Sequence, residues 1–210
     1  GTVTGSAGVT VNIVVVSLAL APTSRTFTRI TQTQTFTPTA RDTLNNIVAN
    51  PGITWTSKNP SFVGVNTSGV ATSVADGATY VVAAATSGAA RDSALVTVSA
   101  VANAASIAPS SVVFGAIGSS RQLSASVLDS GSTAIPGRTV TWSRVGPGTT
   151  ATVGGAGLVT SVAVGTGDSA VATATGPVGP ITAKAPITVT QVVNTIAVTG
   201  SVLPDTLHTT

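Results

Sequence analysis

The chain repeats itself, and this repeat constrains its fold more than any other feature of the sequence. Trp55 and Trp142 lie 87 positions apart in similar surroundings, "ITWTS" and "VTWSR". Further along, a shift of 88 relates Gly69 to Gly157, so one residue has been inserted between the two pairs. The insertion falls in the Gly- and Pro-rich segment "VGPGTTATVGGAG", where a surface loop tolerates added length. A period of this size predicts two similar structural units.

The period also suggests where the units begin and end. We expect complete units over residues 14–100 and 101–191. The opening segment, 1–13, resembles the end of the first copy, so we interpret it as the last strand of a preceding unit. Residues 192–210 resemble the start of the second copy, and we interpret them as the first strand of a following unit. We therefore interpret the chain as part of a longer tandem array.

Within each unit the hydrophobic pattern is that of short strands. Runs such as "RQLSASVLD", "TVTWSRV" and "SAVATATG" are rich in Val, Thr and Ala, which favour extended backbone. Residues 122–127 and 95–99 alternate between apolar and polar, whereas no segment shows a convincing helical period. Gly and Pro separate the runs at turn positions. The pattern predicts an all-β fold of tandem sandwiches.

Composition excludes several functions. Only 7% of the residues are charged and 3% are aromatic, and the net charge of +3 is spread along the chain without a basic run. We therefore expect no nucleic-acid partner. The longest apolar run, Ile13 to Ala21, is too short for a membrane-spanning helix, so we expect no membrane insertion in this segment. Ser and Thr supply 60 residues, and their hydroxyl groups make up most of the polar surface.

Several segments together resemble one known family. These are "LALAPTS", "RQLSASVLD", the Trp strand "ITWTSKNPSFVGVN", "SGVATSVADGATYVVAAAT" and the closing "LVTVS". They resemble the group 2 bacterial Ig-like repeats (BIG2) of intimin- and invasin-like surface proteins, which also occur in secreted and phage-encoded proteins. The second unit departs from the pattern at 145–148, "VGPG". The resemblance covers nearly the whole chain and implies immunoglobulin-like β-sandwiches, a fold that serves many roles.

The aromatic residues are expected in the cores. Trp55 and Trp142 could stack on a sugar, but their equivalent places in Val/Thr-rich strands favour core tryptophans. We predict the same core or near-core placement for Tyr80, Phe27, Phe36, Phe62 and Phe114.

Catalytic chemistry has few candidates. The one histidine is His208, and the chain has no Glu and no Cys. We therefore expect no catalytic residue, no cofactor and no metal site. Calcium is the metal alternative, at Asp42, Asp129 and Asp76, but Asp also caps turns, and we favour that interpretation.

Five other positions carry weaker signals. Arg25 and Arg29 are expected to block pairing at an edge strand, or else to contact an acidic partner. Lys58 and Lys184 are candidates for an intramolecular isopeptide bond, which would need a buried acid beside the lysine. Asn66 begins the glycosylation sequon "NTS".

The sequence favours a structural role outside the cell. We expect a non-catalytic repeat of an extracellular or cell-surface fibre or stalk, which could self-assemble as a filament. The alternatives are an adhesin for a host or matrix ligand and a virion appendage of a phage. Expected partners are neighbouring Ig-like units or copies of the chain, joined by strand addition, and a surface glycan or protein ligand. The Gly-free junction "LVTVSAVANAASIAPSS" predicts limited bending between units.

Overall fold

Short Val/Thr/Ala runs form eighteen strands in the residues that the structure describes. This computed structural model describes residues 1, 4–5 and 13–191. Every regular element within these residues is a β-strand. The all-β prediction is confirmed. The predicted terminal strands, 1–13 and 192–210, lie almost entirely outside the described residues.

The first nine strands form a two-layered sandwich. One layer has the order β2-β9-β8-β5, and the other combines the pair β1-β4 with the sheet β3-β7-β6. The strands are β1 (Ser17–Ala21), β2 (Ser24–Phe27), β3 (Thr33–Thr35), β4 (Thr37–Arg41), β5 (Ile53–Ser57), β6 (Val63–Val65), β7 (Val70–Ser73), β8 (Gly77–Ala85) and β9 (Arg91–Val98). All pairings are antiparallel except β2 with β9, which is parallel.

The next nine strands repeat this topology. The layers are β11-β18-β17-β14 and, opposite, β10-β13 with β12-β16-β15, and β11 pairs with β18 in parallel. The strands are β10 (Ala104–Ala108), β11 (Val112–Phe114), β12 (Ser120–Gln122), β13 (Ser124–Leu128), β14 (Thr141–Val145), β15 (Ala151–Val153), β16 (Leu158–Ser161), β17 (Ser169–Thr175) and β18 (Pro180–Val189). Each strand thus has a counterpart nine places earlier.

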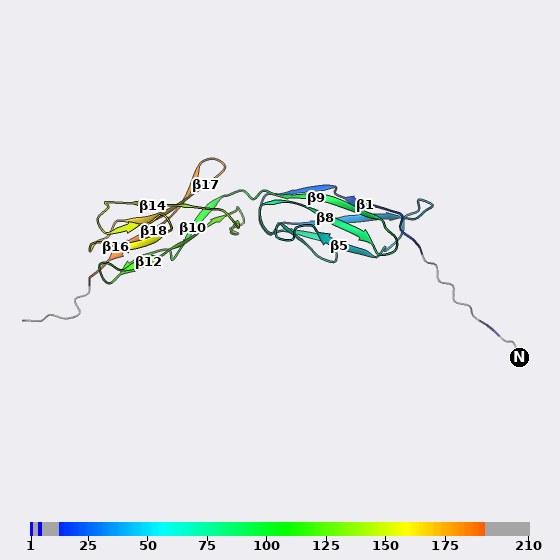
Figure 1. Cartoon of the computed structure of the whole chain (residues 1–210), viewed down its shortest axis with the longest axis horizontal. Helices are drawn as coiled ribbons and strands as arrows, with labels where there is room; N and C mark the ends of the chain where they lie inside the picture. The colour runs from blue at the N-terminus through cyan, green and yellow to red at the C-terminus, as the bar shows by residue number, and fades with distance from the viewer. Residues whose placement is uncertain (2–3, 6–12, 192–210) are drawn as a thin grey trace, which may run out of the picture.

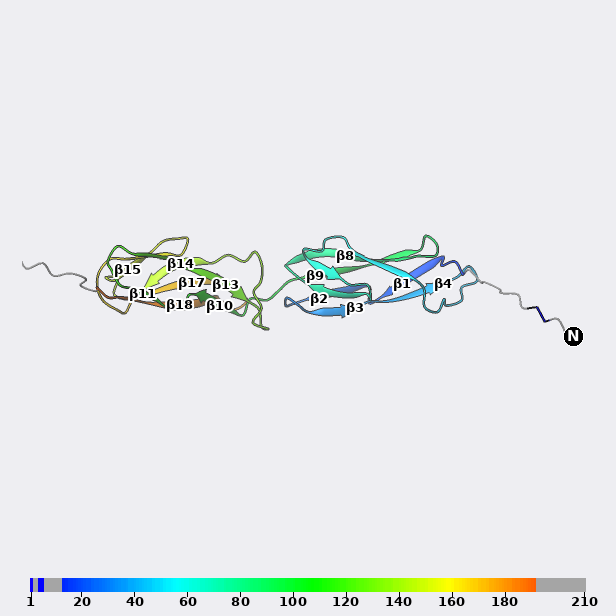
Figure 2. The ribbon, with the colours of Figure 1, turned by 90° about the horizontal axis from the view of Figure 1, so that it is seen from below.

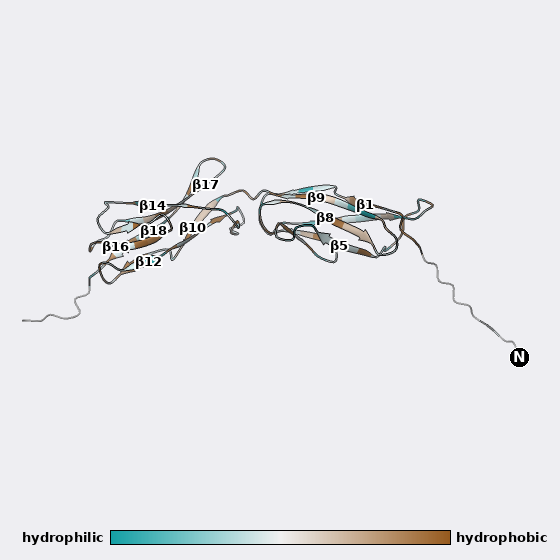
Figure 3. Ribbon diagram, in the orientation of Figure 1, coloured by the Kyte–Doolittle hydropathy of each residue, from teal (hydrophilic) through white to brown (hydrophobic). Residues whose placement is uncertain are grey.

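The two sandwiches lie end to end. Figure 1 and, after a quarter turn, Figure 2 show the β1–β9 sandwich and the β10–β18 sandwich along one long axis, with a short segment between them. Figure 3 shows hydrophobic, brown stretches on strands of both sandwiches, β8 and β18 among them. Each sandwich therefore has its own apolar interior, and the chain passes from one to the next at their facing ends.

Most of the predicted aromatic core residues are buried. Phe27, Phe36 and Phe114 are at most 5% exposed, and Phe62 packs against the first core while partly buried. Tyr80 was predicted wrongly, because its side chain is 49% exposed. It lies on β8 between two buried residues, so strand alternation turns it to the outer face of the sheet.

Each tryptophan is half-buried and covers a glycine. Trp55 and Trp142 pack against the cores of their sandwiches but keep part of the indole exposed. A Cβ atom on Gly69 would lie 2.5 Å from a ring carbon of Trp55, and one on Gly157 would lie 2.7 Å from Trp142. Both glycines have a positive φ, 77° and 83°. The repeated Trp and Gly therefore form one packing unit, which agrees in part with the predicted core role.

This packing predicts that Gly69→Ala destabilises the first sandwich. The new methyl group would collide with Trp55 at a φ that L-residues avoid, so the expected loss is about 1–3 kcal/mol. Urea denaturation followed by tryptophan fluorescence measures it. The matched control is Gly64→Ala, at a strand position with no atom within 4 Å of the added Cβ. Equal effects of the two substitutions would contradict the packing.

Candidate functional site

The backbone that connects β9 to β10 is bonded to both sandwiches. Ser99 N–H donates to Phe27 O at 2.9 Å and Val101 N–H to Thr28 O at 2.9 Å. Two residues later, Asn103 N–H donates to Leu128 O in the second sandwich at 2.8 Å. A flexible linker leaves its backbone to water, whereas this one is fixed on both sides. We call the region where the two sandwiches meet around residues 99–103 the joint.

Apolar contacts continue through the joint. Ala100 and Ala102 are 2% and 6% exposed. They belong to one contiguous buried cluster that includes Ile30 of the first sandwich and Val127 and Ile135 of the second. Because the cluster crosses from one sandwich to the other, bending at the joint would expose apolar surface to water.

A buried carboxylate, Asp129, spans the joint. Its Oδ1 accepts hydrogen bonds from Gly131 N–H at 2.8 Å and Thr133 N–H at 3.0 Å, which fixes the turn after β13. Its Oδ2 accepts Ile30 N–H from the first sandwich at 2.8 Å. The side chain is 1% exposed. One oxygen therefore holds its own turn, and the other holds the neighbouring sandwich.

The surroundings of Asp129 favour its charged form. Burial alone would raise the pKa of this carboxyl, but the N–H groups of Thr133, Ile30 and Gly131 and the positive charge of Arg29 hold it below its ordinary value of 3.8. The carboxylate is therefore ionised at neutral pH, and each of its hydrogen bonds is charge-assisted.

A second contact across the joint is ionic. Arg138 Nη2 lies 2.7 Å from Asp76 Oδ2 and donates to Ala100 O at 3.0 Å. Asp76 Oδ1 accepts Ala100 N–H at 2.7 Å. The carboxylate of the first sandwich and the guanidinium of the second thus hold the same linker residue, Ala100, through its N–H and its carbonyl oxygen. The two side chains are partly exposed, so the pair orients the joint more than it stabilises it.

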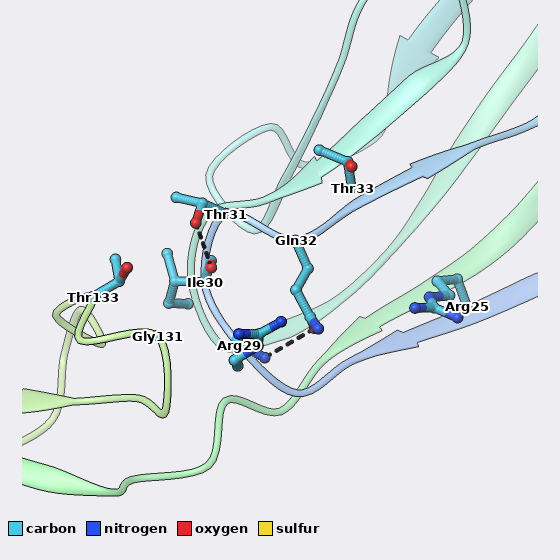
Figure 4. Close-up of a pocket in the computed structure, with 8 residues that line it drawn as sticks. All are labelled: Arg25, Arg29, Ile30, Thr31, Gln32, Thr33, Gly131 and Thr133. Atoms are coloured by element: carbon cyan, nitrogen blue, oxygen red, sulfur yellow. Dashed lines mark hydrogen bonds between the residues drawn. The ribbon is translucent and has the colours of Figure 1, made fainter.

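A groove runs beside the joint. Figure 4 shows that Arg25, Arg29 and Gln32 of the first sandwich line it on one side and the turn of Gly131 and Thr133 lies across from them. Gln32 Oε1 accepts the N–H of Arg29 at 3.1 Å, which orders this loop. The groove offers guanidinium, amide and hydroxyl groups, which can bind an acidic group but lack the paired acid and base of a catalytic site.

The structure places one of the two arginines on an edge strand, and its role in blocking strand pairing stays a prediction. Arg25 lies on β2, the edge strand of its sheet, with its guanidinium carbon 5.5 Å from the centre of the Phe27 ring. Arg29 follows the strand and faces Asp129 and Gly131 at the joint.

Another buried carboxylate, Asp168, holds the loop after β14, which has no close counterpart in the sequence of the first unit. It accepts the N–H groups of Gly148, Thr150 and Ala151, the Thr150 hydroxyl and Arg144 Nη1. Burial would raise the pKa of Asp168, but these donors bring it well below its ordinary value. The carboxylate replaces the "NPS" turn of the first unit as the support of this loop.

The proposed calcium ligands act as turn and linker caps. Asp42 accepts the N–H groups of Leu44 and Asn46, each at 2.9 Å, as Asp129 does in the second unit, and Asp76 accepts Ala100 N–H. Within residues 1, 4–5 and 13–191, no three His, Cys, Asp or Glu side chains lie close enough together to hold a metal ion. The turn interpretation describes these contacts.

The remaining candidates lie apart from the joint or outside the described residues. Lys58 and Lys184 are exposed, and in the part of the chain that the structure describes neither lysine forms an ion pair with a carboxylate. Asn66 is exposed in the turn between β6 and β7 and accepts the N–H groups of Ser68 and Val70. His208 lies outside the described residues. In the part of the chain that the structure describes, no helix is long and apolar enough to span a membrane.

Comparison with known proteins finds structural likeness only. No family model and no curated protein matches the chain. Domains 4–9 of the S-layer protein SbsC are 19% identical over 88% of this chain and 32% of that one, with a TM-score of 0.39. The Yersinia pseudotuberculosis adhesin InvE is 17% identical over 81% of this chain and 58% of that one, with a TM-score of 0.40.

A third solved structure, Drosophila N-cadherin EC1-3, is 17% identical over 82% of this chain and 65% of that one, with a TM-score of 0.32. This chain thus spans less than two thirds of the length of each of the three. At these identities and scores the fold assignment rests on the strands of this chain. Membership of the group 2 family stays a prediction.

The sequence predicted only part of the joint. Asp76 and Asp129 were recognised as caps, but Arg138 was not singled out, and no pattern indicated the bond from Asp129 to Ile30. One signal was present. At Arg138 and Asp76 the repeat is broken, because the equivalent residues are Pro51 and Val164. Charged residues that differ between similar copies are candidates for contacts that only one position in the array makes.

Acidification is predicted to weaken the joint through Asp129. Because the folded-state pKa lies below 3.8, the carboxylate stabilises the structure above that pH, and this contribution is lost as pH falls through the folded pKa. In a pH titration by NMR, the Ile30 amide proton should move upfield as Asp129 is protonated below pH 3.8. Asp129→Asn should abolish this step, and Asp42→Asn should leave it. An Ile30 amide that titrates equally in Asp129→Asn would refute the assignment.

Removing the ionic contact is predicted to loosen the joint without unfolding either sandwich. Arg138→Ala should change the free energy of unfolding by about 1 kcal/mol or less, because the pair is partly exposed. Small-angle X-ray scattering should nevertheless show a broader range of end-to-end distances. Arg121→Ala removes an exposed arginine on β12, away from the joint, and should leave the scattering unchanged. A scattering curve for Arg138→Ala that matches the parent would count against an orienting role.

Proposed function

We propose that this chain is a non-catalytic structural segment of an extended rod at the outer surface of a cell. Its two units are residues 14–100 and 101–191, held end to end by the joint. The observation that carries the proposal is the bond from Ile30 N–H to the buried Asp129 carboxylate, within an apolar cluster that crosses from one sandwich to the other.

The joint favours a rod over a string of loosely tethered beads. Separating the sandwiches would leave the Asp129 carboxylate without one of its donors and would expose Ala102 and Ile135 to water. Both changes cost free energy, since buried charge needs its partners and apolar surface avoids water. The end-to-end arrangement therefore supports a part that transmits length and direction.

The surface supports a place outside the cell. With 7% charged residues and 60 Ser and Thr residues, hydration comes mainly from hydroxyl groups, whose interaction with water changes little with ionic strength. The same hydroxyls are candidate attachment sites for glycans. Tandem Ig-like sandwiches of the group 2 type would fit this setting, and self-assembly into a filament is part of the proposal.

An adhesin is the second candidate, and the groove beside the joint favours it. Arg25 and Arg29 lie along this groove and present two positive charges in a molecule that has few. An acidic group of a protein or glycan ligand would be attracted there. The virion alternative gains no support from the described residues. Strand addition by segments 1–13 and 192–210 stays a prediction, because these segments lie almost entirely outside the described residues.

Two measurements test the rod. Small-angle scattering of the purified chain should give one narrow end-to-end distance, consistent with two sandwiches in line. Immunogold electron microscopy of the source cells should place the label on thin projections at the surface. A scattering profile of two freely hinged bodies, or label confined to the cell interior, would overturn the proposal.

A further inference from the structure

Half of the joint occurs again at the far end of the second sandwich. In the first sandwich, residues 29–32 form the loop that donates Ile30 N–H. Residues 116–119 form the same loop, because Gly118 N–H donates to Ser161 O and Ser161 Oγ donates to Ala116 O. The counterparts at the joint are the bonds of Thr31 N–H to Ser73 O and of Ser73 Oγ to Arg29 O. Ile117 therefore stands where Ile30 stands, and we call this surface the outer C-face.

The other half occurs again at the near end of the first sandwich. Asp42 forms the same turn as Asp129, with Asn45 and Ser132 at equivalent positive φ values of 65° and 61°. Its Oδ1 holds the turn, while its Oδ2 has only a long contact, 3.3 Å, with the exposed Asn46 side chain. The oxygen that binds Ile30 in the case of Asp129 is thus accessible in Asp42. We call this surface the outer N-face.

We propose that the outer N-face of one copy of this chain docks onto the outer C-face of a second copy, with the Asp42 carboxylate accepting Ile117 N–H. The joint within the chain is the template for this contact. The inference deepens the proposed function, on which it rests, by naming the surface through which copies join head to tail.

Exposed apolar side chains support this docking. Ile117 is 48% exposed, whereas Ile30 in the joint is 7% exposed. On the outer N-face, Leu44 and Ile47 are 80% and 67% exposed. Large apolar side chains this exposed on two complementary end faces indicate surfaces that are covered in the assembled state.

Equivalent positions of the joint and of the outer faces carry different residues on both sides of the contact. Leu44 and Ile47 replace Gly131 and Ala134 on the N-face side of the contact. Charged residues of the joint are replaced by apolar ones on the outer faces: Arg138 by Pro51, Asp76 by Val164 and Arg29 by Ala116. The joint is therefore partly ionic, whereas the outer contact would be mainly apolar around two charges, Asp42 and Arg41. Arg41 stands where the joint has Leu128, and its guanidinium donates to Asn45 O of its own turn.

This exchange also favours the correct pairing of faces. Suppose that the outer N-face docked instead on the end of the first sandwich that carries Ile30 and Asp76. Pro51 would then lie against Asp76, and this carboxylate would be covered without its arginine. Covering a charge without its partner is costly. The two outer faces, by contrast, carry no counterpart of Asp76 or Arg138, and Arg41 keeps its hydrogen bond to Asn45 O of its own turn. They therefore fit each other better than they fit either half of the joint.

Sedimentation velocity of the full chain over a wide concentration range tests the docking. The wild-type chain should form progressively longer species as its concentration rises. Leu44→Asp and Ile117→Asp should each lower the association constant at least tenfold, because each places a charge in the apolar contact. Both residues are exposed, so folding should be retained, and tryptophan fluorescence verifies this. Val178→Asp, at a residue 99% exposed and on neither outer face, is the matched control.

A mixing experiment tests the alignment of the faces. Pro51→Arg in one chain and Val164→Asp in another would rebuild the ionic pair of the joint between copies. The mixture of the two variants should associate more tightly than either variant alone, and high salt should reduce the difference.

Three results would overturn the proposal: a chain that stays monomeric at every concentration, association that Val178→Asp weakens as much as Leu44→Asp does, or no gain on mixing the two variants. None of these results would contradict the proposed rod, because small-angle scattering of the dilute chain tests the joint within one chain independently. A narrow end-to-end distance together with a monomeric chain would reject the docking and keep the proposed function.

Discussion

The arrangement of the two sandwiches depends on the Asp129 carboxylate, whose two oxygens bind different partners. One oxygen accepts the N–H groups of Gly131 and Thr133 in its own turn, and these bonds do not require the neighbouring sandwich. The other oxygen accepts Ile30 N–H, and it is already aimed by the first set of bonds. Because the carboxylate is pre-ordered, little conformational entropy is lost when the two sandwiches meet. The apolar cluster and the Arg138 contact then act on an orientation that this carboxylate defines.

Most carboxylates of the chain bind the backbone in a similar way. Asp42, Asp76, Asp92, Asp129 and Asp168 each accept at least one backbone N–H. A carboxylate bonded to backbone donors stabilises a turn or a strand end more reliably than an exposed ion pair does. Asp42 and Asp129 cap donors of their own turns, whereas Asp76, Asp92 and Asp168 accept N–H groups from other segments of the chain. Charge here serves mainly to bind the backbone, and hydroxyl groups serve the surface.

The sequence was sufficient for the strands and most of the core, and insufficient for the joint. Period and alternation predicted the sandwiches and placed Phe27, Phe36 and Phe114 inside, since burial on a strand follows from neighbours two positions away. The prediction for Tyr80 was wrong because it rested on the size of the aromatic side chain, whereas the alternation of β8 turns this residue to the outer face. The Asp129 turn could be predicted because its donors are local. Its bond to Ile30 could not, because that donor lies 99 positions away and offers only a backbone N–H, which every non-proline residue has.

The parallel pairing of β2 with β9 has a mechanical consequence. β2 lies near the start of the first sandwich and β9 at its end, and the second sandwich repeats the arrangement with β11 and β18. A stretching force that enters at the beginning of a sandwich and leaves at its end pulls these two strands past each other along their length. Their hydrogen bonds lie across that direction, so they are loaded together rather than opened one after another. Each sandwich is thus built to resist tension along the axis on which the two are aligned.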